Sequence, residues 1–311
     1  LLEIRWDAAS RTDWNRYVAD ASKCPFEQSW SYGEAIVATG GGVKRAIFRK
    51  NHKPVAFAQL FTKKIGAIAT IVQLLRGPVF LTETTDLADR FDALRLLKES
   101  DLRLSRMIKF WTPEILESPN NGSSFQNLKL RRVMTGYNTV WLNLNSDSKG
   151  LRQKLEGNWR NGLVKAEKQG LKIRASSDLK TIEWITSIYE ALRKKRRFGG
   201  PSATLLRAAY QCASDRSNFI VLQASLKHEL AAAILLVRHG TSATYVIGWN
   251  NDLGRRTNAN TLLLWQGMLI LKNENVSSFD LGGIDTHSLP GIARFKLGMG
   301  GEIASLAGTY F

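Results

Sequence analysis

FIVLQASLKHELAAAILLVRHGTSATYVIGW, residues 219–249, contains three apolar runs separated by short polar turns. The runs cover residues 219–226, 230–237 and 243–249, and each has the length of a strand. Because short turns join antiparallel neighbours, the stretch predicts a meander of three antiparallel strands. A helix at 261–271 and a strand at 277–281 follow, so this part of the chain predicts an α/β unit.

A similar order of elements is predicted earlier in the chain. A helix comes first, then a hairpin, a further strand, a second helix and a last strand. Their predicted ranges are 28–39, 43–49 with 55–61, 67–74, 86–105 and 107–111. Gly40, Gly41 and Gly42 end the first helix, because glycine does not sustain a helix. Although no residue-level repeat is visible, the order indicates two similar α/β modules in tandem.

A basic helix is predicted between the two modules. Leu151, Leu155, Trp159 and Leu163 are spaced by four residues and form one apolar stripe, and Gly170 ends the helix. Its other faces carry cations, namely Arg152, Lys154, Arg160, Lys165 and Lys168. Such a face is either solvated or binds an anion. The polar stretch 143–150 before it is the predicted domain linker.

A further helix begins at Asp178, which can cap it, and Gly199-Gly200-Pro201 stops it. It ends in Lys194-Lys195-Arg196-Arg197, which we call the basic run. Positive charge is favourable at the C-terminus of a helix because of the helix dipole. That explanation suffices for the basic run, and contact with tRNA is the alternative.

Composition excludes several classes of protein. The chain has 311 residues, 44% of them hydrophobic and 23% charged, which is typical of a folded globular protein of two domains. Its two cysteines, Cys24 and Cys212, form neither a disulfide framework nor a metal site, so we expect a reducing, cytoplasmic setting and no metal. The most apolar run, 230–237, is far too short to cross a bilayer. Nothing near Leu1 resembles a signal peptide.

The formal net charge is +17 at pH 7. Such a charge attracts polyanions, including nucleic acid, nucleotide-linked substrates and anionic lipid headgroups. Solubility alone also accounts for it in many proteins. Charge therefore does not identify the partner.

Several segments together resemble the Fem family of aminoacyltransferases. The motifs, in chain order, are Gln28-Ser29-Trp30, Arg76-Gly77-Pro78-Val79, Arg160-Asn161 with Lys165-Ala166 and Gly170, Tyr245 to Trp249, Leu264-Trp265, Asp280-Leu281-Gly282-Gly283, and Gly291-Ile292-Ala293-Arg294-Phe295-Lys296. Each motif alone is weakly specific, and their order and spacing carry the resemblance over residues 28–301. Some members insert a two-helix arm, which this chain lacks.

The resemblance implies an α/β (α+β) fold of two tandem GNAT-like acyltransferase domains, each with a mostly antiparallel or mixed sheet flanked by helices. Domain 1 would cover residues 1–148, completed by 297–311, and domain 2 residues 149–296. It also implies transfer of an amino acid from aminoacyl-tRNA to the amine of a nucleotide- or lipid-linked muropeptide, a peptidoglycan precursor. The expected setting is the cytoplasm, with contact to the inner face of the membrane left open. No cofactor is expected besides the donor substrate.

The resemblance places Lys296 beside the acyl-transfer centre, with Phe295 packed beneath it. Attack of an amine on an ester forms a tetrahedral oxyanion, which a positioned cation stabilises. A surface lysine beside a core phenylalanine is the alternative interpretation. Asp280, Asp285 and His287 are possible general bases, although Asp280 could instead cap a turn and a substrate phosphate could accept the proton.

The acceptor's diphosphate calls for cationic donors. Arg76, Arg160 and Lys165 are the predicted ligands, with Tyr245 and Trp249 as further substrate contacts. Arg76 could equally stabilise its glycine-proline turn.

Two other functions remain open. An acyl-CoA-dependent N-acyltransferase acting on a sugar, lipid or peptide amine would use the same fold, with acetyl-CoA as donor. Such an enzyme cradles the CoA pyrophosphate in a glycine-rich loop at a helix start, and the corresponding segment 254–260 has one glycine, Gly254. Arg255 and Arg256 could bind phosphate there instead. A non-enzymatic nucleic-acid-binding protein would rely on charge alone, since no recognition motif is present.

Overall fold

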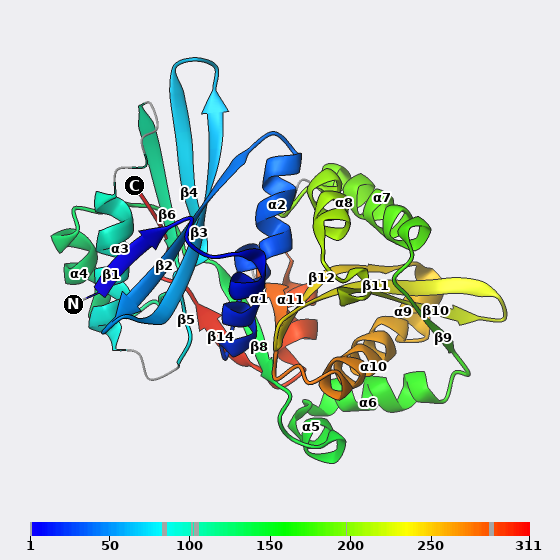
Figure 1. Cartoon of the computed structure of the whole chain (residues 1–311). Helices are drawn as coiled ribbons and strands as arrows, with labels where there is room; N and C mark the ends of the chain where they lie inside the picture. The colour runs from blue at the N-terminus through cyan, green and yellow to red at the C-terminus, as the bar shows by residue number, and fades with distance from the viewer. Residues whose placement is uncertain (1, 83–85, 101, 103–105, 197, 286–288) are drawn as a thin grey trace. The chain divides into compact units, whose positions relative to one another are not determined.

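The computed structural model describes residues 2–82, 86–100, 102, 106–196, 198–285 and 289–311 (Figure 1). The chain forms two compact units. Unit 1 comprises Leu1–Asn138 and Ala304–Phe311, and unit 2 comprises Thr139–Ile303. Each unit contains one sheet flanked by helices, so the predicted α/β fold class is confirmed.

Unit 1 has a mixed sheet in the order β1-β2-β3-β4-β6-β15-β7, with β5 paired to β3. Its strands are β1 (Leu2–Trp6), β2 (Gly42–Lys50), β3 (Lys53–Ile65), β4 (Ala69–Gly77), β5 (Val79–Phe80), β6 (Met107–Pro113), β7 (Arg132–Met134) and β15 (Thr309–Tyr310). Its helices are α1 (Arg11–Asp20), the 3-10 turn η1 (Phe26–Gln28), α2 (Trp30–Ala38), α3 (Leu87–Glu99) and α4 (Asn121–Asn127). The pair β4–β6 is parallel.

Successive side chains of β2 are buried on opposite faces of this sheet. Phe48 packs in one core cluster with Leu94 of α3, whereas Ile47 packs in another with Trp14 of α1. Since successive strand residues point to opposite faces, helices cover both sides.

The predicted helix at 28–39 is α2, and Ser29 caps it by accepting a hydrogen bond from the Tyr32 N–H. Gln28 lies just outside it and is fully buried. Its amide donates to the Leu75 carbonyl at 2.7 Å and accepts from the Gln59 N–H at 2.8 Å. Gln28 therefore ties the start of α2 to β3 and β4. The predicted helix at 86–105 is α3, which ends earlier, at Glu99, where Ser100 adopts an extended conformation.

Unit 2 has a sheet in the order β14-β8-β13-β12-β11-β10-β9. Its strands are β8 (Asn138–Asn143), β9 (Lys172–Ser176), β10 (Phe219–Leu226), β11 (Glu229–His239), β12 (Ser242–Asn250), β13 (Ser278–Gly283) and β14 (Glu302–Ser305). Its helices are α5 (Ser148–Lys154), α6 (Gly157–Glu167), α7 (Leu179–Arg196), α8 (Ala203–Cys212), the 3-10 turn η2 (Arg216–Asn218), α9 (Asp252–Arg256), α10 (Ala259–Asn273) and α11 (Pro290–Leu297). The predicted meander is confirmed as β10-β11-β12.

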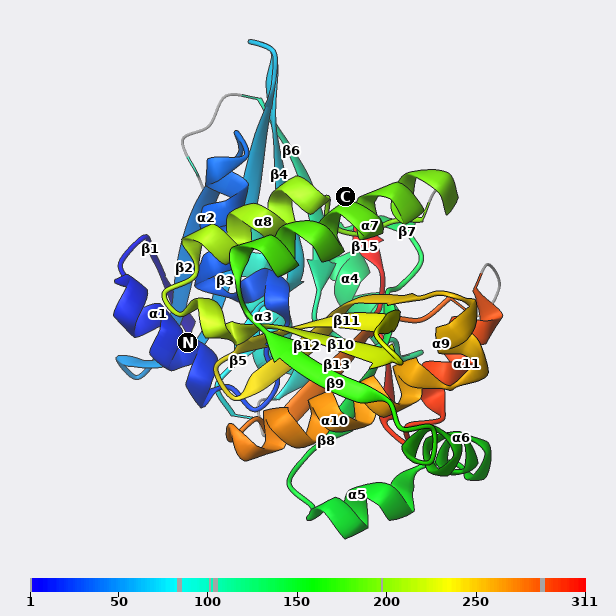
Figure 2. The same ribbon diagram turned by 90° about the vertical axis from the view of Figure 1, so that its right-hand side faces the viewer.

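Helices cover both faces of the unit 2 sheet (Figure 2). On one side α10 packs against β11 and α6 packs against α10, and their core includes Trp159, Leu163 and Ile234. On the other side α7 and α8 lie over the sheet. Leu230–Val237 is apolar throughout because both faces of β11 are buried.

The unit boundary lies at Asn138/Thr139, and not within the predicted linker. Residues 143–150 belong to unit 2, because β8 pairs with β13 and α5 begins at Ser148. At the other end β15 pairs with β6 and β7, so residues 304–311 belong to unit 1.

The single basic helix predicted over residues 151–170 is wrong. Leu155 and Glu156 adopt extended conformations, so the segment forms two helices, α5 and α6. Arg160 donates to the carbonyl groups of Gln153 and Leu155, at 3.0 and 2.8 Å, and so satisfies the end of α5. The apolar stripe remains buried in one core despite the break.

Candidate functional site

In unit 2 the parallel strands β12 and β13 pair over three residues each. Their register ends at Thr244 and Asp280, so the strands part beyond this point. In the same place Val246 of β12 has no counterpart in β11, because Leu235 pairs with Ile247 and Leu236 with Tyr245. This bulge and the parted strands interrupt an otherwise continuous sheet. Bulges are frequent beside functional sites because they redirect side chains and free backbone groups.

Asp280 lies at the point where the strands part and is fully buried. Its Oδ1 accepts a hydrogen bond from the Thr139 hydroxyl and one from the Gly282 N–H at 2.7 Å. Gly282 has φ +71°, and a Cβ there would lie 3.1 Å from the Tyr245 carbonyl and 3.6 Å from Lys296 Nζ. Asp280 thus holds a tight glycine turn against Lys296.

Lys296 lies on α11 and is only 8% exposed. Its Nζ donates to the Gly283 carbonyl at 2.8 Å and lies 5.6 Å from the centroid of the Tyr245 ring. Burial lowers the pKa of Lys296 to about 8, and the charge of Asp280 opposes this shift. A buried ammonium group whose pKa lies near neutrality is typical of functional sites.

Phe295, which the resemblance places beneath Lys296, packs against an aromatic ring of α6. Its ring lies 5.9 Å from the ring of Trp159, on α6. Successive helix residues point in directions about 100° apart, so Phe295 and Lys296 face different surroundings. The ring next to the lysine belongs to Tyr245, a phenol whose pKa is raised by burial.

Tyr245 and Trp249, which the resemblance assigns to the substrate, face different parts of unit 2. Tyr245 packs against the core cluster shared with α6 and α10. Trp249 has its ring 6.0 Å from Trp184 of α7. The sheet separates these two environments, so the structure places only Tyr245 beside Lys296.

Of the predicted diphosphate ligands, Arg76 is in unit 1, whereas Arg160 and Lys165 are in unit 2. Arg76 is 4% exposed and has φ +53°. Its guanidinium donates to both carboxylate oxygens of Glu114, at 3.1 and 2.9 Å. These contacts favour the alternative interpretation of Arg76 as the residue that stabilises its turn. On α6, Lys165 is exposed.

The described part of the basic run lies exposed at the end of α7. Lys194 comes within 4.0 Å of Glu190, and Lys195 and Arg196 are exposed. Arg197 and His287 lie outside the described residues. Asp285, one of the possible bases, is exposed after β13.

In the segment that corresponds to a CoA pyrophosphate loop, the single glycine already makes close contacts within the protein. The Gly254 N–H donates to Asn251 Oδ1 at 2.9 Å, and a Cβ on Gly254 would lie 2.2 Å from the Ala231 carbonyl. Gly254 is therefore needed for close packing of α9 on β11. Arg255 pairs with Asp252, and Arg256 is exposed.

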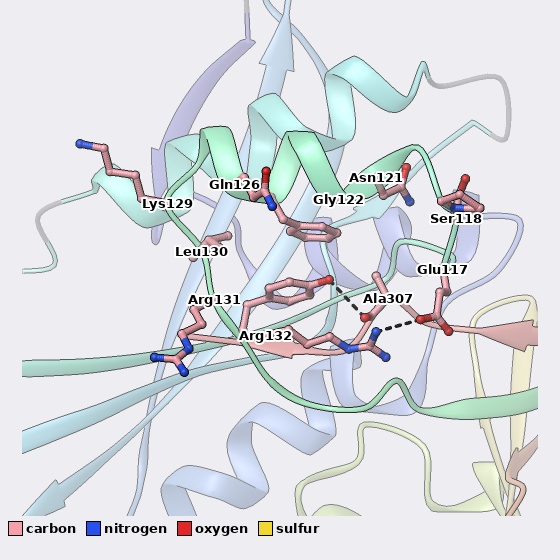
Figure 3. A pocket seen from close by; sticks show the side chains of 13 residues that line it. Glu117, Ser118, Asn121, Gly122, Gln126, Lys129, Leu130, Arg131, Arg132 and Ala307 are labelled. Atoms are coloured by element: carbon pink, nitrogen blue, oxygen red, sulfur yellow. Dashed lines mark hydrogen bonds and ion pairs between the residues drawn. The ribbon is translucent and has the colours of Figure 1, made fainter.

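Unit 1 contains a separate open cavity of about 570 Å³ (Figure 3). Phe125 of α4 stacks on Tyr310 of β15 inside it, with ring centroids 3.9 Å apart. Arg132 and Glu117 form an ion pair at its edge. None of the predicted site residues is among those that line it, so it is not part of the candidate acyl-transfer site.

Within the described ranges, His, Cys, Asp and Glu side chains do not gather in groups of three or more that could hold a metal ion. Nor does any helix in these ranges combine the length and the apolar character needed to cross a membrane.

Comparisons with known proteins support the fold. Residues 153–297 match the family described as acetyltransferase (GNAT) domain. The crystal structure of FemX is similar over 98% of this chain and 96% of its own, with a TM-score of 0.80 and 14% identity. A tandem GNAT protein from the clavulanic acid biosynthesis pathway covers 100% and 98%, with a TM-score of 0.53 and 14% identity.

The C-terminal domain of a putative lysylphosphatidylglycerol synthetase from Agrobacterium fabrum is also similar, with a TM-score of 0.53 and 16% identity over 97% of this chain and 92% of that one. No curated protein matches the chain significantly. Residues 153–297 of the chain are thus similar to GNAT acetyltransferase domains, and the chain as a whole shares the fold of FemX.

Proposed function

We propose that this protein is an acyltransferase that moves an amino acid from aminoacyl-tRNA to the amine of a peptidoglycan-precursor peptide. The observation that carries the proposal is the buried ammonium group of Lys296, held where β12 and β13 part. The resemblance to the Fem family supports the choice of donor and acceptor. The transfer would take place in unit 2.

The chemistry needs one new bond and the loss of another. The acceptor amine attacks the carbonyl carbon of the aminoacyl ester, forming a C–N bond and placing negative charge on the carbonyl oxygen. The C–O bond to the tRNA ribose then breaks, and the ribose oxygen takes a proton as the attacking nitrogen loses one. With a pKa of about 8, Lys296 is about nine-tenths protonated at pH 7 and can stabilise the oxyanion.

Asp280 fits a positioning role better than that of a general base. It is fully buried and engaged by Thr139 and Gly282. Its charge also opposes the loss of the Lys296 proton, since it raises the lysine's pKa against the effect of burial. Asp280 would therefore keep the lysine charged and its turn in place, while a substrate phosphate or water carries the proton.

An acyl-CoA-dependent N-acyltransferase is the second candidate function. The match of residues 153–297 to acetyltransferase domains favours it. The packing of Gly254 against Ala231 weighs against it, because that glycine is already used for helix-strand contact. Fold does not decide between the two, since one fold serves many acyl donors.

The two functions differ in which donor loses its acyl group. Radiolabel should be followed from a mixed aminoacyl-tRNA pool, and in parallel from acetyl-CoA, to a muropeptide precursor. Lys296→Met is the test variant, and Lys180→Met, exposed on α7, is the control. We expect transfer from tRNA that Lys296→Met lowers by about 10²–10³ and Lys180→Met leaves unchanged. Transfer solely from acetyl-CoA would refute the proposed donor, and equal turnover of both variants would refute the role of Lys296.

A further inference from the structure

The end of the β3–β4 hairpin extends beyond its sheet. On one side the pairing of β2 with β3 stops at Thr62, and on the other the pairing of β6 with β4 stops at Thr70. Among the described residues, Lys63–Ile65 thus lie beyond the last pair with β2 and Ala69 lies beyond the last pair with β6, and this end of the hairpin projects from unit 1 in Figure 1. We call residues 63–69 the hairpin tip.

The hairpin tip exposes two isoleucines. Ile65 is 46% exposed and Ile68 is 68% exposed, the latter being the most exposed large hydrophobic side chain in the described parts of the chain. Gly66 between them has φ +54°, which suits the tight turn. The two branched aliphatic side chains are grouped at one protruding turn, and a grouped apolar patch of this kind favours contact with an apolar partner.

The charged residues of the β3–β4 hairpin have one sign. Lys63 and Lys64 are exposed, and residues 53–77 contain no Asp or Glu. Because strand residues alternate, Lys63 shares a face with Ile65 while Lys64 points to the other face. Lysine thus flanks the apolar turn on both faces of the hairpin. A matching partner has an anionic surface and an apolar interior beneath it.

The geometry points to the hairpin tip as an anchor for an anionic lipid bilayer. Ile65 and Ile68 enter the acyl-chain boundary, and Lys63 and Lys64 stay at the level of the lipid phosphates, with their aliphatic stems lying along the apolar layer. A nucleic acid would use the lysines but not the isoleucines. A second copy of the tip would bring four lysines together, and the like charges would oppose that contact.

Vesicle sedimentation tests this assignment without any measurement of activity. The full chain is mixed with vesicles of phosphatidylglycerol and phosphatidylcholine, and with vesicles of phosphatidylcholine alone. We expect binding to the mixed vesicles. Ile65→Ser with Ile68→Ser should weaken it at least about tenfold. Lys63→Gln with Lys64→Gln should weaken it about fivefold for each lysine at low salt, and less at high salt.

Leu116→Ser with Ile303→Ser is the matched control, since these aliphatic side chains are 58% and 57% exposed outside the tip. The control should bind mixed vesicles like the unaltered protein, and all variants should keep its unfolding midpoint because only exposed side chains change. Equal binding by the isoleucine variant and the control would overturn the proposal. So would failure of the unaltered chain to bind mixed vesicles, or a loss of self-association instead of lipid binding in the isoleucine variant.

Discussion

Replacing Lys296 with Met should lower turnover and, at the same time, change how stability depends on pH. Methionine has a similar length but no charge, so the oxyanion loses its cation. Removal of one such stabilising donor typically costs about 10²–10³ in kcat. The stability effect has a separate origin, namely the cost of keeping a charged lysine at 8% exposure.

The size of that cost follows from the lysine's pKa, which falls from 10.5 to about 8 in the folded protein. One pKa unit corresponds to about 1.4 kcal/mol, so burying the charge costs about 3 kcal/mol at pH 7. Between the folded and unfolded pKa values the unfolded chain holds more protons, and folding stability rises with pH. From pH 7 to about 9.5 the unaltered protein should therefore gain about 2 kcal/mol relative to Lys296→Met.

Urea unfolding at a series of pH values measures this difference. The hydrogen bond to Gly283 is lost in the variant at every pH, so it shifts the two stability curves apart without changing their relative slope. Lys180→Met, at an exposed position, should run parallel to the unaltered protein. If the Lys296→Met curve also runs parallel, the lysine is not buried as a charge and the electrostatic argument fails.

Asp280→Asn removes the charge that raises the pKa of Lys296, so the alkaline loss of kcat should begin at lower pH; an unchanged kcat profile would exclude the coupling. Gly282→Ala should lower the free energy of unfolding by about 1–3 kcal/mol and reduce kcat, because its φ of +71° strains any side chain; wild-type values in both assays would contradict this. Arg76→Ala should destabilise the protein by about 3–5 kcal/mol by leaving Glu114 unpaired, measured by urea unfolding; a raised acceptor KM at unchanged stability would instead support substrate binding. Neutralising the basic run should reduce the salt dependence of tRNA affinity, measured by filter binding, and an unchanged slope would leave it a solvated helix end.

Local sequence patterns predict the elements that depend on residues close together in the chain. The β10-β11-β12 meander, the β2–β3 hairpin and α7 each follow from a periodicity or a turn signal within about twenty residues. Short elements contain too few periods for a periodicity to be recognised, which is why β9 and α11 are not predicted. Lys296 was selected by motif resemblance, and the helix that carries it was not predicted.

The sequence by itself determined the α/β class, the order of the main elements and the likeness to the Fem family. Tertiary structure alone decided what surrounds the site. Thr139 meets Asp280 across 141 positions of sequence, and the ring of Tyr245 lies beside the Lys296 ammonium group. Such contacts depend on strand register and on the point where β12 and β13 part, and a periodic sequence pattern specifies neither of them.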